Sequence, residues 1–549
     1  MFGKKFYGLR GFPLALAIGV IAGMDFLLFG FDQGVMGGIL TMDTFFTRFP
    51  SIDVNNPPSG QSSSHVSTTQ GITVASYNLG CFAGAVATIW LGDNLGRKRM
   101  IFFGSAIMVI GAALQASAFS IPHLVVGRLI TGFGNGMNTS TVPTWQSETS
   151  KSHRRGQLVM VEGALITGGI MLSYWIDYAF AFTQPSEICW RFPLAFQIVF
   201  ALIILACIPG LPESPRWLVL KNRDQEAREV LSALWDKDLD DPSIESEFTD
   251  IKEAVAVMAS GSFKDLFTMD QDRNFHRSVL AYVVQAMQQL SGINLITYYA
   301  ATIYTGSLGL NQELSRLLAA LNGTEYFLAS WIPVFTVEKF GRRPLMLFGA
   351  VGMSISMAVL TGTTVDPNNK SAGIAAAVFL FVFNSFFAIG WLGMTWLYPA
   401  EIVPLRIRAP ANALSTSANW ITNFLVVMIT PIAFDNIKYR TYIIFAVINA
   451  AIVPCVYFFY PETAGRSLEE MDAIFHKTTG PFDVVQHAKE MPRRYDNAGK
   501  LIVNPAEENG KADVQITQGD HQAAAENGLL GPGTGSLRGS SGDVSEKTA

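Results

Sequence analysis

The main pattern along the 549-residue chain is a series of long apolar segments separated by short polar stretches. Each segment holds roughly 20 mainly apolar residues, the length that an α-helix needs to cross the hydrocarbon core of a bilayer. The segments cover residues 13–40, 70–92, 100–120, 122–147, 157–182, 191–211, 275–307, 314–337, 344–363, 372–398, 410–434 and 440–460. The pattern therefore predicts an all-α membrane protein with twelve transmembrane helices.

The longest polar interruption divides these segments into two sets of six. Within it, Ala227, Val230, Leu231 and Leu234 recur at helical spacing among charged residues, which predicts short amphipathic helices at the membrane surface. The C-terminal tail is polar and rich in Gly, Asn and Gln, so we expect it to be largely disordered after about residue 480. The predicted parts are an N-terminus (1–12), a six-helix bundle (13–211), a helical linker (212–274), a second bundle (275–460) and a tail (461–549).

Composition supports the membrane assignment, because 49% of the residues are hydrophobic and only 15% are charged. The sequence has no basic patch interleaved with aromatic residues, so nothing in it indicates binding of nucleic acid. The sequence also has no nucleophile–base pair and no metal-ligand cluster, so we expect neither an enzyme nor a bound metal or other cofactor. The four cysteines form no CxxC pair and are interpreted as packing residues. The first apolar segment is too long for a cleavable signal peptide, so we expect an uncleaved first span.

The positions of lysine and arginine predict the orientation. Basic residues gather in four loops, whereas the loops on the opposite side hold few. The basic loops contain Arg97, Lys98 and Arg99; Lys151, Arg154 and Arg155; Lys339, Arg342 and Arg343; and Arg406 and Arg408. Since such loops face the cytoplasm, both termini are predicted to be cytoplasmic. Asn369-Lys-Ser371 then forms a glycosylation acceptor pattern in an outer loop.

The chain repeats itself at a nearly constant offset. Asp93-Asn-Leu-Gly-Arg-Lys98 recurs 245 residues later as Glu338-Lys-Phe-Gly-Arg-Arg343, and Glu148 recurs 253 residues later as Glu401. Pro212-Glu-Ser-Pro-Arg216 recurs loosely from Pro461, 249 residues later. Two homologous halves suit a carrier that rocks around a central site. A duplicated channel is the alternative, but the repeated acid–base pairs favour latches between moving helices.

Asp32 lies in the first apolar segment, within Phe29-Gly-Phe-Asp-Gln-Gly-Val-Met-Gly-Gly38. An ionisable group there costs roughly 3 kcal/mol or more, so it usually faces a cavity or a partner. An acid near a helix end that reaches water is the alternative. Arg128, in the fourth segment, has similarly apolar surroundings.

Several motifs together resemble the sugar porter family of the major facilitator superfamily over residues 13–476. They are Gly96-Arg97-Lys98, Pro212-Glu-Ser-Pro-Arg-Trp217, Gln288-Gln-Leu-Ser-Gly-Ile-Asn294, Gly341-Arg-Arg343 and Pro461-Glu-Thr-Ala-Gly-Arg-Ser-Leu-Glu-Glu470. Asn138–Glu148, Tyr174–Asp177 and Trp190–Pro193 are similar to a fungal group that includes glycerol/proton symporters. The resemblance implies the major facilitator fold. We separately expect a protein that works as a monomer.

A sugar site needs amides that both donate and accept hydrogen bonds, together with aromatic platforms. The seventh segment supplies Gln288, Gln289, Asn294 and Tyr298, for which interhelical hydrogen bonding is the alternative role. The resemblance assigns sugar contact to the first three of these, and it adds Trp396, Asn419 and Trp420. One departure is Gly163, preceded by Glu162, where hexose-binding members usually carry a glutamine. Hexose selectivity is therefore open, and neither Glu162 nor Glu325 receives a role.

The resemblance pairs Arg128 with Asp32, and passive members commonly lack this acid, so proton coupling is expected. Asp25 is either a second titrating group or a polar residue that faces water. The resemblance also implies charged clusters at the cytoplasmic helix ends that stabilise the outward-open state. Their members are Arg97, Glu148, Arg155, Glu213 and Arg216 in the first half, and Glu338, Arg342, Arg343, Glu401 and Arg408 in the second.

We therefore expect proton-coupled uptake of a monosaccharide or small polyol across the plasma membrane by alternating access. The partners are the sugar or polyol, protons and the lipid bilayer. A glycerol-type polyol symporter is one alternative. A sugar sensor that signals through its tail is another, although sensors tend to have much longer tails.

Overall fold

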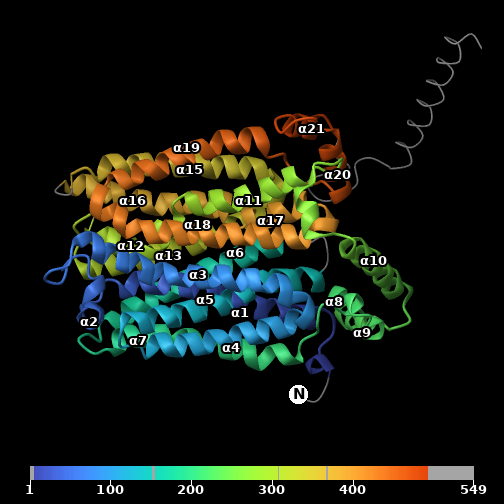
Figure 1. Ribbon diagram of the computed structural model, residues 1–549, viewed down its shortest axis with the longest axis horizontal. Coiled ribbons are helices and arrows are strands. Elements are labelled where there is room, and N and C mark those ends of the chain that lie inside the picture. Colours follow the sequence, from blue (N-terminus) through green and yellow to red (C-terminus); the bar gives the residue numbers. More distant parts are fainter. Residues whose placement is uncertain (1–4, 151–154, 307, 367–368, 492–549) are drawn as a thin grey trace, which may run out of the picture. The chain divides into compact units, whose positions relative to one another are not determined.

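The computed structural model describes residues 5–150, 155–306, 308–366 and 369–491, with the side chain of Arg155 also outside the description. All regular structure in these ranges is helical. Figure 1 shows the long helices running side by side, with α8, α9, α10 and α20 gathered at one end. We call this end the linker end and the opposite end of the bundle the far end.

The first six long helices form what we call the N-half. They are α1 (Gly11–Ile39), α3 (Ser63–Leu95), α4 (Arg97–Ala116), α5 (Ile121–Thr149), α6 (Arg155–Ala181) and α7 (Ile188–Cys207). A short helix, α2 (Asp43–Arg48), follows α1. Glycines set the closest helix approaches, since a Cβ on Gly30 would lie 1.8 Å from the Ile166 carbonyl oxygen and one on Gly80 would lie 2.3 Å from that of Leu129. Small residues at helix contacts are the usual means of close packing within a membrane.

The second six spans form the C-half, and three of them are interrupted. The bounds are α11 (Asn274–Leu290) with α12 (Ile293–Gly306); α13 (Gln312–Ala329) with α14 (Ile332–Phe340); α15 (Arg342–Thr363); α16 (Lys370–Phe387) with the π-helical η6 (Ala388–Leu392) and α17 (Met394–Ile402); α18 (Arg408–Ile437); and α19 (Arg440–Phe459). Ten spans in the described part of the chain are long and apolar enough to cross a membrane. The more polar α5 and the divided α13–α14 complete the predicted twelve, so the chain is a multi-pass membrane protein.

The linker contains α8 (Pro215–Leu220), α9 (Asp224–Trp235) and α10 (Pro242–Ala259). The four apolar residues that predicted its amphipathic character, Ala227, Val230, Leu231 and Leu234, are all buried. Burial of one apolar face is the usual reason that short helices of this kind remain folded.

The tail departs from the expectation of disorder after about residue 480. After α20 (Leu468–Lys477), a further helix, α21, runs over Val484–Glu490. Val484, Val485 and Ala488 form its buried face, and this apolar spacing explains why the segment is ordered. Residues 492–549 lie outside the described residues, so disorder there stays a prediction.

Candidate functional site

Two interrupted spans of the C-half meet at the centre of the candidate site. Gly292, with a φ of +96°, separates α11 from α12, and the π-helical η6 separates α16 from α17. Gln288 lies just before the first break, and its Nε2 donates to the carbonyl oxygens of Trp391 and Leu392, each at 3.1 Å. Irregular helix turns expose backbone carbonyls that side chains can bind. The two breaks are therefore joined through Gln288.

Four of the predicted substrate residues form one buried amide network with Gln285. The Oε1 atom of Gln288 accepts hydrogen bonds from Asn419 Nδ2 at 2.9 Å and from Gln289 Nε2 at 3.1 Å. Asn294 Nδ2 donates to Gln289 Oε1, and Asn419 Nδ2 also donates to Gln285 Oε1 at 2.7 Å. All five side chains are buried. The network offers both donors and acceptors, as recognition of hydroxyl groups requires.

A second polar chain crosses between the halves. The Tyr298 hydroxyl, in the C-half, donates to Asn78 Oδ1 in α3 at 3.1 Å, and Asn78 Nδ2 donates to Asn423 Oδ1 in α18 at 3.1 Å. The side-chain Nδ2 of Asn423 has no acceptor among the described residues. Tyr298 thus joins the predicted site, although its contact is with the opposite half.

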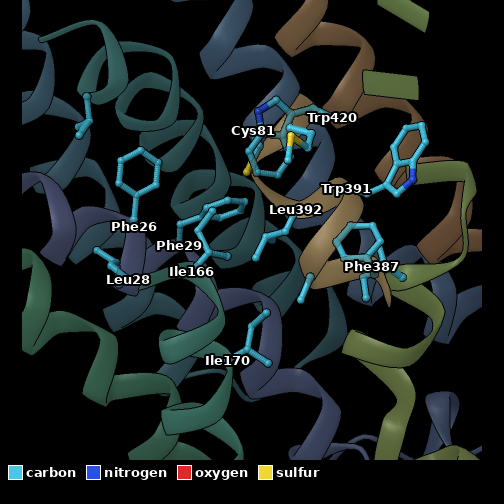
Figure 2. Close-up of a cluster of buried hydrophobic side chains, with 14 of the residues drawn as sticks. Phe26, Leu28, Phe29, Cys81, Ile166, Ile170, Phe387, Trp391, Leu392 and Trp420 are labelled. Carbon is cyan, nitrogen blue, oxygen red and sulfur yellow. The ribbon is translucent and has the colours of Figure 1, made fainter. Parts of the chain in front are cut away.

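Trp420 supplies an aromatic platform between the halves. Its ring meets Phe29 of α1 edge-on at a centroid distance of 5.3 Å and Tyr77 of α3 at 6.5 Å. Figure 2 shows Phe29 and Trp420 in the same buried cluster, with Leu392 pointing toward Phe29 and Ile166. The indole Nε1 of Trp420 is buried without an acceptor among the described residues. This orphan donor is suited to a hydroxyl oxygen.

Trp396 is not part of the network that the structure describes. It is half-buried in α17, whereas Trp391 of η6 is fully buried. The indole of Trp391 donates to the Met346 carbonyl at 3.0 Å, and Figure 2 shows its ring on the opposite side of its helix from Leu392. Trp391 therefore anchors η6, and it gives the network its carbonyl rather than its ring.

Asp32 is buried and has Tyr77 as its polar neighbour. The Tyr77 hydroxyl donates to Asp32 Oδ2 at 3.5 Å, the long limit for a hydrogen bond. The Arg128 guanidinium lies 5.4 Å from the centroid of the Tyr77 ring, and its Nη2 donates to the Val74 carbonyl at 2.9 Å. In the described part of the chain, Asp32 and Arg128 form no ion pair within 4.0 Å. Tyr77 thus stands between the acid and the arginine that the resemblance pairs.

Three further acids are partly or fully enclosed. Asp25 is 1% exposed and accepts from Asn138 Nδ2 at 2.7 Å, so it does not face water in this conformation. Glu162 is buried, and within the described ranges its carboxylate has neither a hydrogen bond nor an ion pair. Glu325 is half-buried in α13 and accepts from the Ser385 hydroxyl. Each of these groups carries the cost of burying a carboxyl away from water.

Gly163, the departure from hexose-binding relatives, packs against η6. A Cβ at this position would lie 3.3 Å from Leu392 Cγ, so a longer side chain needs Leu392 to move. Because the Leu392 carbonyl binds Gln288, the glycine lies beside the amide network. A leucine side chain therefore occupies the space that a glutamine from α6 would use.

The charged residues at the linker end pair within each half. Arg97 binds Glu148 at 3.2 Å in the N-half, and Arg342 binds both Glu401 and Glu338 at 2.7 Å in the C-half. The remaining predicted members are placed differently: Arg343 donates to the Tyr457 carbonyl, Arg408 donates to the Val403 carbonyl, and Arg216 is half-buried. The side chain of Arg155 lies outside the described residues.

The two helix starts at these clusters are built alike. Glu213 accepts from the backbone N–H groups of Arg97 at 3.1 Å and Lys98 at 3.2 Å. Glu462 accepts from those of Arg342 at 2.9 Å and Arg343 at 3.0 Å. Burial raises the pKa of Glu213, although these and other backbone donors oppose the shift. Carboxylates at helix N-termini satisfy otherwise unpaired N–H groups.

Sequence reasoning missed five residues of the site: Tyr77, Asn78, Gln285, Asn423 and Glu462. Residue spacing could have identified two of them, because Asn423 follows Asn419 by one helical turn and Gln285 precedes Gln289 by one turn. Glu462 is the repeat partner of Glu213. For Tyr77 and Asn78 we find no sequence signal, because a tyrosine and an asparagine in a membrane span have many other uses.

Asn369, the predicted glycosylation acceptor, is exposed at the start of α16. Its Oδ1 accepts a hydrogen bond from the Ala372 N–H at 3.2 Å and caps the helix. The position is therefore accessible in the structure, while its modification stays a prediction.

A family model described as "Sugar (and other) transporter" matches residues 18–475. The chain is 40% identical over 495 residues to "Sugar transporter STL1" of Saccharomyces cerevisiae, covering 88% of this chain and 86% of that protein. It is also 40% identical over 480 residues to "MFS-type transporter oryC" of Aspergillus oryzae, covering 86% and 87%.

A solved structure with a similar fold is the proton:xylose symporter XylE bound to 6-bromo-6-deoxy-D-glucose. The two chains are 25% identical, and the match covers 84% of this chain and 99% of that one with a TM-score of 0.72. Another solved structure of XylE from E. coli, in an inward-open conformation, matches with a TM-score of 0.67.

Proposed function

Because this chain belongs to the sugar (and other) transporter family, we propose that it carries a monosaccharide, either a hexose or a pentose, or a small polyol across the plasma membrane. As a family member it is a multi-pass transporter and not an enzyme. We further propose that it works as a monomer and that substrate entry is coupled to proton entry. From the charge distribution we infer that the linker end faces the cytoplasm and that the far end faces the outside.

The observation that carries the substrate proposal is the buried amide network with its orphan donors. Gln288 and Asn419 bind other amides in this conformation, so exchange of one amide partner for a substrate hydroxyl leaves both groups satisfied. Trp420 Nε1 and Asn423 Nδ2 have no acceptor among the described residues, and each can donate to a hydroxyl oxygen. Phe29 and Trp420 supply the apolar faces that pack against C–H groups.

The arrangement around Asp32 supports proton coupling. A buried carboxyl with one long hydrogen bond and no ion pair within 4.0 Å gains or loses its charge readily when its surroundings change. Tyr77 contacts Asp32 through its hydroxyl and Trp420 through its ring, while its chain neighbour Asn78 binds Tyr298. A change in the charge of Asp32 therefore reaches the substrate side through α3. Asp25, held by Asn138, is proposed as a second proton-binding group.

Alternating access follows from the two halves and their charged ends. Because the pairs Arg97–Glu148 and Arg342–Glu401 lie within their halves, we propose that they keep each half rigid while the halves rock. The capping acids Glu213 and Glu462 fix the starts of α4 and α15 in the same way. Contacts between the halves then decide which side is open.

A polyol is the second candidate substrate, and Gly163 favours it. Leu392 fills the space beside this glycine, so a hydroxyl contact that an α6 glutamine would supply is missing. A short polyol presents fewer hydroxyl groups than a hexose and depends less on such a contact.

Uptake in a cell that lacks its own sugar and glycerol carriers tests the proposal. Labelled glucose, xylose and glycerol are compared at acid and neutral outside pH. We expect one of them to accumulate, and to accumulate more at acid pH. Signalling without accumulation of any of the three would instead identify a sensor.

A further inference from the structure

A cavity lies at the linker end, between the N-half and the linker. Its volume is about 540 Å³, within the range of roughly 300–1,000 Å³ that small-molecule sites occupy. It is lined by the segment before α1, the start of α4, the turn after α7, and the linker helices α8 and α9. Figure 1 shows α8 and α9 at this end of the bundle. The cavity shares no lining residue with the amide network, so it is separate from the candidate substrate site.

One wall of the cavity belongs to the lipid-facing stripe of α4. This helix is long and apolar enough to cross a membrane, and Phe102, Phe103 and Ile110 are exposed on it. Arg99 precedes the two phenylalanines by three and four residues, so it lies at the linker end of the same stripe. Arg99, Phe102 and Phe103 all line the cavity. The cavity is therefore open to lipid along α4, with a basic residue where the span leaves the hydrocarbon core.

Two consecutive basic side chains in the lining lack an acidic partner among the described residues. Lys98 Nζ donates to the Pro209 carbonyl oxygen at 3.0 Å, which uses one of its three donors and neutralises none of its charge. Arg99 is exposed, and its side chain makes no hydrogen bond or ion pair within the described part of the chain. Like charges on neighbouring side chains repel each other, so an anion bound between them is stabilised by both.

The carboxylates that line the same cavity already have donors. They are Glu213, which accepts from the N–H groups at the start of α4, Glu226, which accepts from Arg223 Nε at 2.8 Å, and Glu229, which binds Lys5. Each of these acids is thus compensated within the lining. The positive charges of the two consecutive basic residues are left for a ligand from outside the protein.

The repeat in the C-half shows that the helix start does not itself require these charges. At the start of α15, Arg343 stands at the place of Lys98 and Pro344 at the place of Arg99. Arg343 turns to its own half, where its Nη2 donates to the Tyr457 carbonyl oxygen at 2.7 Å. Orientation in the membrane is an alternative reason for a basic residue at position 99. It does not account for a cavity between that residue and the linker.

We propose that this cavity binds the headgroup of an anionic phospholipid, with the phosphate held by Lys98 and Arg99 and the acyl chains lying along Phe102 and Phe103. Lysine and arginine are the usual partners of phosphate oxygens, and arginine can bind two of them at once. Anionic lipids are abundant in the cytoplasmic leaflet, the leaflet that we infer at this end. A lipid in the cavity contacts both α4 and the linker helices, so it stabilises the packing of the linker on the N-half.

The test measures lipid binding to the full-length protein in detergent by native mass spectrometry. Phosphatidylinositol is the anionic probe, and phosphatidylcholine, which has no net charge, is the reference lipid. The variants are Lys98→Gln, Arg99→Gln, the double variant, and Arg99→Lys, which keeps the charge. Lys264→Gln is the matched control, because Lys264 is an exposed lysine of the linker that does not line the cavity. Unchanged affinity for phosphatidylcholine shows that a variant is folded.

We expect wild type to bind phosphatidylinositol at least about tenfold more tightly than phosphatidylcholine, as two basic residues at a membrane surface imply. Each single Gln variant should lose about fivefold in affinity for phosphatidylinositol, and the double variant more than about tenfold. Arg99→Lys and Lys264→Gln should change this affinity by less than about threefold. Equal affinity of wild type for the two lipids, or unchanged phosphatidylinositol affinity in the double variant, would overturn the site.

Soluble competitors separate a lipid site from a site for a free anion. Inorganic phosphate and inositol 1-phosphate carry the same phosphate chemistry but lack the acyl chains that pack against Phe102 and Phe103. We therefore expect neither to displace phosphatidylinositol when present at the same concentration. Displacement by either one would overturn the lipid assignment and identify a soluble anion as the ligand. Because binding is measured without substrate or a proton gradient, its outcome is independent of the proposed transport.

Discussion

The hydroxyl of Tyr298 in the C-half donates a hydrogen bond to Oδ1 of Asn78 in the N-half across 3.1 Å. Asn78 follows Tyr77, whose hydroxyl reaches Asp32 and whose ring lies against Trp420. Two consecutive residues of α3 therefore touch the proposed proton group, the aromatic platform and the opposite half. This short path is the physical basis for coupling in our account.

Replacement of Tyr298 by phenylalanine should loosen the contact between the halves. The change removes one hydrogen bond and leaves Asn78 Oδ1 without its donor, at a cost of about 0.5–1.5 kcal/mol, or roughly 2- to 12-fold in apparent substrate affinity. Tyr299→Phe is the matched control, because the Tyr299 hydroxyl donates to the Val427 carbonyl within the C-half at 3.1 Å. Kinetics of labelled-substrate uptake distinguish the two variants, and an equal change in both would contradict the role of the bond between the halves.

Gln288→Ala should weaken substrate binding, because Gln288 links both helix breaks and bonds Asn419 and Gln289. We expect a loss of about 1–3 kcal/mol, roughly 5- to 150-fold in affinity. Gln197→Ala provides the comparison, since Gln197 is a buried glutamine of α7 that donates to the Leu194 carbonyl at 2.6 Å within its own helix. Uptake at sub-saturating substrate is normalised to the amount of protein at the cell surface. Unchanged uptake by the Gln288 variant would place the substrate elsewhere.

The Gly163–Leu392 contact should control substrate size. Gly163→Gln alone clashes with Leu392, so uptake of every substrate is expected to fall. Adding Leu392→Ala makes room for the new amide, which then binds one more hydroxyl. The double variant should raise the ratio of labelled glucose to labelled glycerol uptake by roughly fivefold, the value of one net hydrogen bond. An unchanged ratio, with both substrates still transported, would remove α6 from the determinants of selectivity.

Gly341→Ala should destabilise the C-half at the linker end. Gly341 has φ +89° and ψ +169°, a conformation that other residues rarely adopt, and an added Cβ would lie 2.5 Å from Glu462 Oε2. We expect a loss of about 1–3 kcal/mol, seen as a lower Tm in detergent. Gly362→Ala, near the other end of α15, has no atom within 4 Å of its new Cβ and should be neutral or slightly stabilising. Equal Tm values for the two variants would argue against the capping geometry.

The sequence predicted the twelve spans well because long apolar runs have few structural outcomes. It did not predict the breaks at Gly292 and η6, since a π-helical turn depends on contacts such as that between Trp391 and Met346. The amide network followed from the family motif, but its geometry required the fold. Helix α21 was missed because three apolar residues in a polar tail gave too weak a signal.

The placement of Arg128 shows a different limit of prediction from sequence. Resemblance named both Asp32 and Arg128, yet only the structure shows Tyr77 between them and the Val74 carbonyl bound to the arginine. Which charged residues pair in a transporter depends on its conformation, and one sequence encodes every conformation of the transport cycle.

Asp32→Asn tests the central claim, that proton movement through Asp32 drives accumulation. Asparagine keeps the size and most of the hydrogen bonding of aspartate but cannot titrate. Some general damage is expected, because Arg128 loses the nearest opposite charge. The mode of transport is therefore more informative than its rate. Asp25→Asn, made in parallel, shows whether the second buried acid has the same role.

The decisive measurement is substrate accumulation in proteoliposomes under an imposed inward proton gradient, recorded together with the outside pH. Wild type should concentrate the substrate and alkalinise the outside medium. The Asp32→Asn protein should still bind substrate and exchange labelled for unlabelled molecules, but it should neither concentrate substrate nor move protons. Accumulation by the variant in response to the gradient would contradict the account, and a wild type that ignores the gradient would show the protein to be a facilitator.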